Sequence, residues 1–165
     1  MFQSLTDWLI RIGPRLQRAF IEGERWKLYL QGLGTTLELT VIALIFGVLL
    51  GLVVAVVRSA HDQQRLGRRN PVLGVLNVLC QIYTTVIRGT PMLVQLFIWT
   101  FVIFPTQRNK VLVAFIGLGV NSGAYVAEII RGGLMSVDIG QSEAGRSLGL
   151  NYFDTMRFIV IPQAF

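Results

Sequence analysis

Long apolar stretches that contain no charged residue alternate with short polar segments along this chain. Four such stretches cover residues 39–57, 70–87, 89–107 and 111–127. A helix needs roughly 20 mostly apolar residues to cross the hydrocarbon core of a bilayer. Because each stretch approaches that length, the pattern predicts helices that span a membrane.

The composition supports the same class. Hydrophobic residues make up 53% of the 165 residues and charged residues only 15%, and the mean hydropathy is +0.59. These values differ from the usual balance of a soluble domain. A buried globular core is the alternative, but a chain of this length has no use for so many continuous apolar stretches. We therefore predict an all-α, polytopic membrane helical bundle with three full spans and the start of a fourth.

The charges between the stretches orient the predicted spans. The first span is expected over about residues 34–57, and the loop after it contains Arg58, Arg65, Arg68 and Arg69. Because basic loops stay in the cytoplasm, we place this loop there. The expected order after the loop is a return over residues 70–105, a crossing over 111–133, a cytoplasmic segment over 135–151 and a fourth span from about Tyr152.

The returning segment is too long for one simple span. Arg88, Gly89, Thr90 and Pro91 lie in its middle. Proline cannot continue the hydrogen-bond ladder of a helix, and sharp kinks usually occur at such residues. The sequence therefore predicts a break in the helix at this point.

Residues 1–27 are expected to form an amphipathic tail. Apolar and basic side chains recur at helical spacing on opposite sides; the apolar ones are Leu5, Trp8, Leu9, Ile12 and Leu16, and the basic ones are Arg11, Arg15 and Arg18. This pattern fits a helix that lies in the membrane interface, and an ordinary solvated helix fits it as well. The basic charge of the tail conflicts with the outside location that the predicted topology gives it.

A short polar segment over residues 138–150 separates two apolar stretches. Asp138 is a suitable N-cap for a short helix, and Gly149 is a natural stop. We expect Glu143 in the first turn, where a negative charge suits the helix dipole. Ala144 and Leu148 are four residues apart and share one face. From these signals alone, a plain cytoplasmic turn remains an alternative to a docking helix.

Polar residues also share one face of the third predicted span. Asn121, Tyr125 and Glu128 are four and three residues apart, which places them on one side of a helix. An ionisable residue at membrane depth normally faces a protein interior or an aqueous cavity. These residues are candidates for a substrate path, together with Glu38 in the first span. The alternative is that Glu128 pairs with Arg131, one turn later.

The polar segment and the residues after it resemble the cytoplasmic coupling loop of ABC-importer permeases. That loop has the pattern Glu-Ala-Ala, three residues, Gly, nine residues and Ile-x-Leu-Pro. The matching positions are Glu143, Ala144, Gly149, Ile159 and Pro162, and the departures are Gly145 for the second Ala and Ile161 for Leu. The resemblance implies that an ATPase contacts Gln141, Glu143, Ala144, Gly145, Arg146, Leu148 and Gly149.

Three other motifs resemble those of the permeases that import polar amino acids, the histidine/glutamine/arginine permease family. They are Arg88-Gly-Thr-Pro-Met-Leu-Val-Gln95, Asn121-Ser-Gly-Ala-Tyr-Val-Ala-Glu128 with Arg131-Gly-Gly133 after it, and Gly32-Leu-Gly-Thr-Thr-Leu37. The resemblance covers residues 28–165 and implies an incomplete transmembrane domain of the type I ABC-importer kind. Related permeases continue beyond the position of Phe165, so a truncated chain is expected.

By this resemblance, the chain is a pore subunit of an ATP-driven importer in the cell inner membrane. The expected partners are a cytoplasmic ABC ATPase dimer, a second permease subunit of the same or a homologous kind, an extracytoplasmic solute-binding protein and membrane lipid. We expect no catalytic residue, cofactor, metal or nucleic acid, because ATP hydrolysis falls to the partner chain. The alternatives are a permease for another small solute, such as methionine or an opine, and a truncated, non-transporting protein that docks an ATPase.

Overall fold

The computed structural model describes residues 12–15, 17–62, 64 and 70–164, and the regular elements in these ranges are all helical. The chain divides into two compact units, Met1–Val41 and Ile42–Phe165. Helix α2 (Trp26–Asp62) begins in the first unit and ends in the second.

The first unit contains short helical turns before the start of α2. Residues 12–15 form a helical turn, followed by η1 (Gln17–Ile21) and η2 (Glu22–Glu24). Gly23 takes a φ of 65°, a left-handed conformation that glycine adopts readily, just before α2 begins. Residues 1–11 and 16 of the predicted amphipathic tail, which include Leu5, Trp8, Leu9, Arg11 and Leu16, lie outside the described residues.

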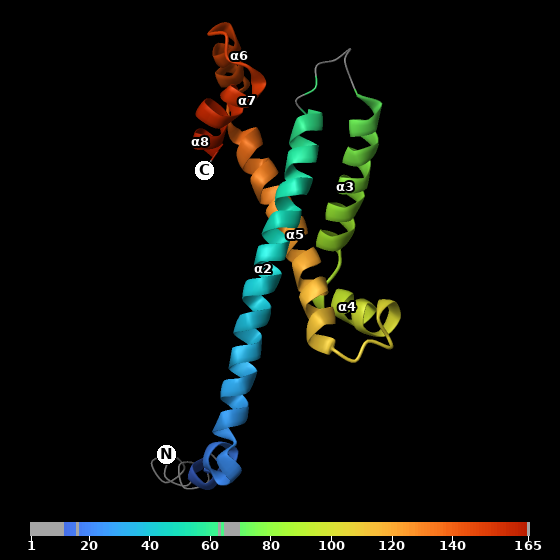
Figure 1. Cartoon of the computed structure of the whole chain (residues 1–165), viewed down its shortest axis with the longest axis vertical. Helices are drawn as coiled ribbons and strands as arrows, with labels where there is room; N and C mark the ends of the chain where they lie inside the picture. Colours follow the sequence, from blue (N-terminus) through green and yellow to red (C-terminus); the bar gives the residue numbers. More distant parts are fainter. Residues whose placement is uncertain (1–11, 16, 63, 65–69, 165) are drawn as a thin grey trace, which may run out of the picture. The chain divides into compact units, whose positions relative to one another are not determined.

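The second unit contains the end of α2 and all the later elements (Figure 1). These elements are α3 (Pro71–Gly89), α4 (Met92–Phe97), η3 (Ile98–Ile103), α5 (Lys110–Ser136), α6 (Ile139–Ser147), α7 (Tyr152–Thr155), η4 (Met156–Val160) and α8 (Ile161–Ala164). By length and composition, α2, α3 and α5 are suited to cross a membrane. The three predicted full spans are therefore confirmed, and the expected fourth begins as a helical run at Tyr152.

The end of the first span differs from the prediction. Arg58 was expected in a cytoplasmic loop, but α2 continues to Asp62. Ser59, the residue after Arg58, is buried. The charge-free pattern ends at Val57, but the helix continues because its last turn still packs against its neighbours, so Arg58 belongs to the helical core.

The predicted break after α3 is confirmed. Helix α3 ends at Gly89, and α4 begins at Met92. The side-chain amide Nε2 of Gln95 lies 2.7 Å from the carbonyl of Ile87 and 3.0 Å from that of Thr90. These carbonyls belong to the last turn of α3 and to the break, where the helix supplies few donors. Gln95 thus stabilises the break that Pro91 imposes.

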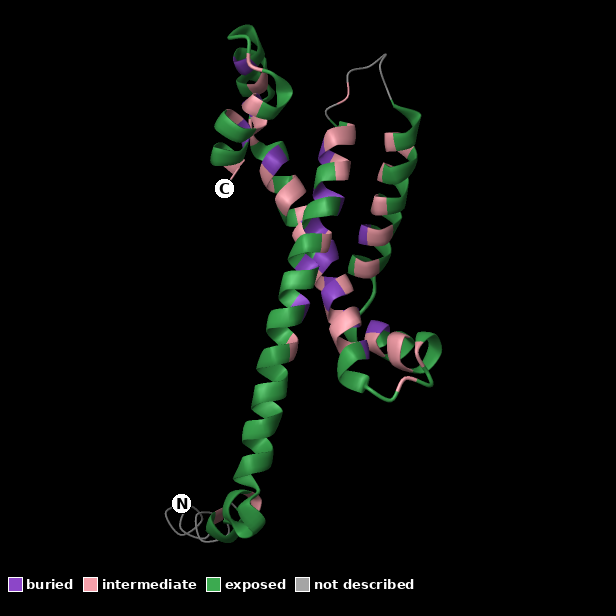
Figure 2. Cartoon of the chain, viewed as in Figure 1, coloured by how far each residue is buried: buried purple, intermediate pink, exposed green. Residues whose placement is uncertain are grey.

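Helices α2 and α5 pack closely in the second unit. A Cβ atom added at Gly47 would lie 2.7 Å from the Cβ of Ser122, and one added at Gly51 would lie 2.7 Å from the Cβ of Val126. Any larger residue there would force the helices apart. Figure 2 shows that the buried residues gather where these helices cross, whereas most outer surfaces are exposed. Small residues at helix contacts are typical of membrane proteins, where close packing drives association.

Candidate functional site

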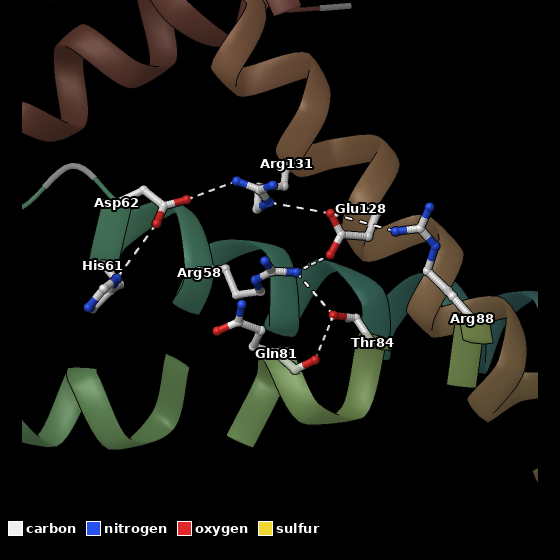
Figure 3. Close-up of polar contacts among 8 residues, drawn as sticks. All are labelled: Arg58, His61, Asp62, Gln81, Thr84, Arg88, Glu128 and Arg131. Carbon is white, nitrogen blue, oxygen red and sulfur yellow. Dashed lines mark hydrogen bonds and ion pairs between the residues drawn. The ribbon is translucent and has the colours of Figure 1, made fainter. Parts of the chain in front are cut away.

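A cluster of charged side chains joins α2, α3 and α5. Its centre is Glu128 on α5, whose carboxylate accepts a hydrogen bond from Arg58 on α2 (Figure 3). The same Arg58 guanidinium donates to the hydroxyl of Thr84 on α3 at 3.1 Å. Both charged side chains are largely enclosed, with Arg58 11% and Glu128 18% exposed. Arg58 therefore ties three helices together from a place where an unpaired charge would be costly.

Arg131 extends the cluster along the same end of the helices. It lies one turn after Glu128 on α5, and its Nε atom is 3.4 Å from Glu128 Oε2. Its Nη1 atom is 3.0 Å from Asp62 Oδ2 at the end of α2. Asp62 also lies 3.6 Å from Nδ1 of His61. Arg131 thus bridges the two carboxylates of the cluster.

Arg88 approaches the cluster from the C-terminal end of α3. Its Nη1 atom is 3.9 Å from Glu128 Oε2, and its side chain is 45% exposed. The guanidinium carbon lies 5.6 Å from the centre of the Tyr125 ring, the geometry of a cation–π contact. Compared with Arg58 and Arg131, Arg88 is the more accessible and less closely paired arginine.

The predicted polar stripe has a different role at each of its positions. Asn121 is buried, and its amide donates to Gln95 Oε1 at 3.1 Å, which fastens α5 to α4. Tyr125 is exposed beneath Arg88. Glu128 does lie near Arg131, as one alternative predicted, but Arg58 is its more enclosed partner. Glu38 belongs to the first unit, where it is exposed.

The predicted coupling segment forms a capped helix, α6. The carboxylate of Asp138 accepts a hydrogen bond from the backbone N–H of Gly140 at 2.6 Å, as expected for an N-cap. Gly149 has a φ of 83°, which allows the chain to leave the helix. Asn151 then caps α7 through Asp154 N–H at 2.9 Å. The predicted start and stop signals of this segment are therefore confirmed.

The predicted place of Glu143 in the first turn is wrong. Because α6 begins at Ile139, Glu143 is in its second turn, and no acidic residue lies in the first. It pairs with Arg146 at 4.0 Å. The favourable dipole interaction that was expected of Glu143 is weak at this position, since the effect falls off within the first turn.

Two faces of α6 have opposite environments. Gly145 is buried, and a Cβ atom there would lie 2.8 Å from Ile159 Cδ1 and 3.1 Å from Thr155 Cγ2. Glycine at this position therefore allows α6 to seat on the following helical run. The opposite side, which carries Glu143, is open. Leu148 is 80% exposed, and Gln141, Ala144, Arg146 and Gly149 are exposed as well. Of the predicted coupling residues, only Gly145 faces inward.

The sequence did not identify several residues of the charged cluster. Asp62 and Thr84 carry no sequence signal of their own, and the charge pattern assigns Arg58 to a loop. Arg88 stands out in the sequence only as part of a motif. The sequence does show ionisable residues at the ends of the predicted spans. It does not show which of these residues contact one another, because the pairing depends on how the helices pack.

The sequence is similar to those of known transport permeases. The L-cystine transport system permease protein TcyB of Bacillus subtilis (strain 168) is 34% identical over 158 residues, which is 94% of this chain and 63% of that protein. The arginine transport system permease protein ArgU of Corynebacterium glutamicum is 36% identical over 144 residues, which is 78% of this chain and 42% of that protein.

A solved structure has the same fold. A chain in the crystal structure of an amino acid ABC transporter with histidines is 38% identical, with a TM-score of 0.70 over 86% of this chain and 62% of that one. This chain spans less than two thirds of the length of each of these three proteins. Residues 71–165, from α3 onwards, match a family described as the binding-protein-dependent transport system inner membrane component. The chain is a membrane protein that belongs to this family of transport permeases.

Proposed function

We propose that this chain is a membrane-spanning pore subunit of an ATP-driven importer of polar amino acids. In this proposal, α6 couples the pore to a separate ATPase. The curated relatives described above are named as permeases for L-cystine and arginine, which supports amino acids as the cargo. The observation that carries the proposal is α6 together with the helical run after it: residues 143–162 have the spacing of the coupling loop, and the outer face of α6 is open.

The geometry of α6 suits the transmission of a push. The helix is capped at its start by Asp138 and ends at Ser147, and Gly149 lets the chain turn away two residues later. Gly145 seats it against Thr155 and Ile159, so its inner side is fixed on the following helical run. Leu148, which follows the last residue of α6 and is 80% exposed, offers an apolar anchor for a partner. A short, rigid helix of this kind moves as a unit when a docked ATPase changes shape, and the motion passes to the attached spans.

The remaining parts of the importer follow from this role. The chain would cross the inner membrane several times, with α6 on the cytoplasmic side. A second permease subunit would complete the pore, an ATPase dimer would grip the two coupling helices, and an extracytoplasmic binding protein would deliver the amino acid. Tyr125, the exposed member of the polar stripe, is proposed to line the path.

The test replaces Glu143 on the open side of α6 by lysine. The change reverses a charge within 4.0 Å of Arg146 and so makes this surface more basic. We expect the Glu143→Lys variant to insert normally but to lose co-purification with the ATPase and ATP-dependent uptake. The matched control is Glu22→Lys, the same change at an exposed residue of the first unit. Normal uptake by the Glu143→Lys variant would remove α6 from the coupling mechanism.

A further inference from the structure

The charged cluster contains one more positive than negative side chain. Its ion pairs join three arginines, Arg58, Arg88 and Arg131, to two carboxylates, Asp62 and Glu128. Charge at the depth of a membrane helix is costly unless it is paired or faces a water-filled cavity. The excess positive charge would therefore be stabilised by an additional anion.

The contacts identify which arginine carries the excess. Arg58 is enclosed and is bound by both Glu128 and Thr84. Arg131 lies within 3.0 Å of Asp62 and 3.4 Å of Glu128. Arg88 has only the 3.9 Å approach to Glu128 and is 45% exposed. Among the described residues of the cluster, the loosely held cation is thus Arg88.

Tyr125 orients this loosely held guanidinium. Its ring lies 5.6 Å from the guanidinium carbon and is itself exposed, so both groups share one accessible surface. An arginine presents its N–H groups in a planar fork that matches a carboxylate with two parallel hydrogen bonds. An aromatic platform restricts the motion of the fork and leaves its edge available to a ligand.

Glu128 is poorly placed to attract a cationic group. Three guanidinium groups already surround its carboxylate. A substrate ammonium would have to displace one of them and would meet the other two. The electrostatics of this surface therefore favour the anionic end of an amino acid over its amino group.

We propose that Arg88, supported by the ring of Tyr125, binds the α-carboxylate of the amino acid in the permease. This inference rests on the proposed function and adds to it the group of the substrate that is recognised. It explains why the more exposed arginine of the cluster stands over an exposed aromatic ring. It also predicts that an amino acid whose carboxylate is converted to an amide binds poorly.

The test uses the assembled permease purified without its binding protein, so that recognition by the other component does not contribute. Radiolabelled L-arginine and L-glutamine are the probes, and the α-carboxamide of each is the competitor. We expect the wild type to prefer the free acid roughly 10- to 100-fold, the value of a charged hydrogen bond. The Arg88→Gln variant should lose this preference and bind the amide as before.

Two further variants separate recognition from structure. Arg88→Lys keeps the charge without the fork, so it should retain a smaller preference for the free acid. Arg157→Gln is the matched control, because Arg157 is also exposed and lies 5.4 Å from the centre of the Phe158 ring. It should bind both probes as the wild type does. Tyr125→Leu should weaken binding of the free acid without restoring that of the amide.

Several results would overturn the inference. One is that the wild type binds acid and amide equally well or binds neither probe. Another is that the Arg88→Gln variant keeps the full preference for the free acid. If Arg88→Gln fails to assemble, an unchanged preference in Arg88→Lys would overturn the inference, because the planar fork of the guanidinium would then make no difference to binding. ATP-dependent uptake by the wild type is measured in parallel, since its absence refutes the proposed function, whereas uptake with an unchanged preference refutes only this inference.

Discussion

Replacing Glu128 by glutamine removes the negative charge at the centre of the cluster while keeping the shape of the side chain. Arg58 would then have the hydroxyl of Thr84 as its remaining partner among the cluster contacts. Arg131 would still have Asp62 at 3.0 Å. The main consequence is thus an enclosed guanidinium without a counter-charge, so the energetic effect should fall on Arg58.

The burial of the pair sets the expected loss in the free energy of unfolding. Removing one partner of a buried ion pair costs about 3–5 kcal/mol, because the other charge stays buried and uncompensated. The glutamine oxygen still accepts one hydrogen bond, so we expect a loss near the lower end, about 3 kcal/mol. Arg131→Gln should cost less, about 1 kcal/mol, because that side chain is 28% exposed and Glu128 keeps Arg58.

The assay is a pair of double-mutant cycles. Unfolding of the purified chain in mixed detergent micelles is followed by circular dichroism for the Glu128→Gln, Arg58→Gln and Arg131→Gln variants. The combinations of Glu128→Gln with each arginine change complete the cycles. Adding Arg58→Gln to Glu128→Gln should restore most of the lost stability, because it removes the uncompensated charge. Adding Arg131→Gln should restore little.

The opposite pattern would refute this reasoning. If Arg131→Gln rescued the Glu128→Gln variant and Arg58→Gln did not, the helix-internal pair would be the important one. A Glu128→Gln variant as stable as the wild type would show that the carboxylate does not balance an enclosed charge at all.

Three other changes test the packing and exposure described above. Gly51→Leu should destabilise the protein by about 1–3 kcal/mol, because its side chain would overlap Val126 on α5; Gly74→Ala, which meets nothing within 4 Å, is the control, and equal melting temperatures for both variants would contradict the close packing of α2 and α5. Gln95→Leu should cost about 1–3 kcal/mol through the amide of Asn121 and the carbonyls it leaves unbonded, whereas Gln163→Leu, at an exposed site, should cost little. In a Cys80→Ala background, a cysteine at Tyr125 should react with a water-soluble thiol reagent and one at the buried Ala127 should not; equal labelling of both would remove the accessible surface beneath Arg88.

Local patterns were sufficient to predict the spans and the ends of α6. The charge-free stretches predicted α2, α3 and α5, and Pro91 predicted the break after α3. Asp138 and Gly149 predicted the limits of α6. These features depend on residues that are neighbours in the sequence, such as caps, glycines and a proline, and their effect on the backbone is largely independent of the rest of the fold.

The partners in the charged cluster could not be found in this way. Arg58 and Glu128 are 70 positions apart, and they meet only because α2 and α5 pack closely at Gly47 and Gly51. The charge on Arg58 looked like the start of a loop, since the apolar stretch stops just before it. The sequence pattern located ionisable residues near helix ends, but the choice of partners is a property of the packed helices.

Asn121 illustrates the same limit for the polar stripe. Helical spacing correctly placed it on one face with Tyr125 and Glu128. That face is not uniform, however, because α4 covers Asn121 and bonds it through Gln95, whereas Tyr125 is left exposed. Spacing along one helix gives direction but does not show which positions the next element covers.

In the proposed mechanism, this chain moves amino acids when an ATPase pushes on α6. The most direct measurement is uptake of radiolabelled arginine, glutamine and cystine into proteoliposomes that contain the assembled transporter, its binding protein and internal ATP. We predict ATP-dependent uptake by the wild type. We also predict its loss in Leu148→Asp, because this residue is 80% exposed in the structure and would become buried on docking. Uptake that needs no ATP, or that is unchanged by Leu148→Asp, would contradict the account.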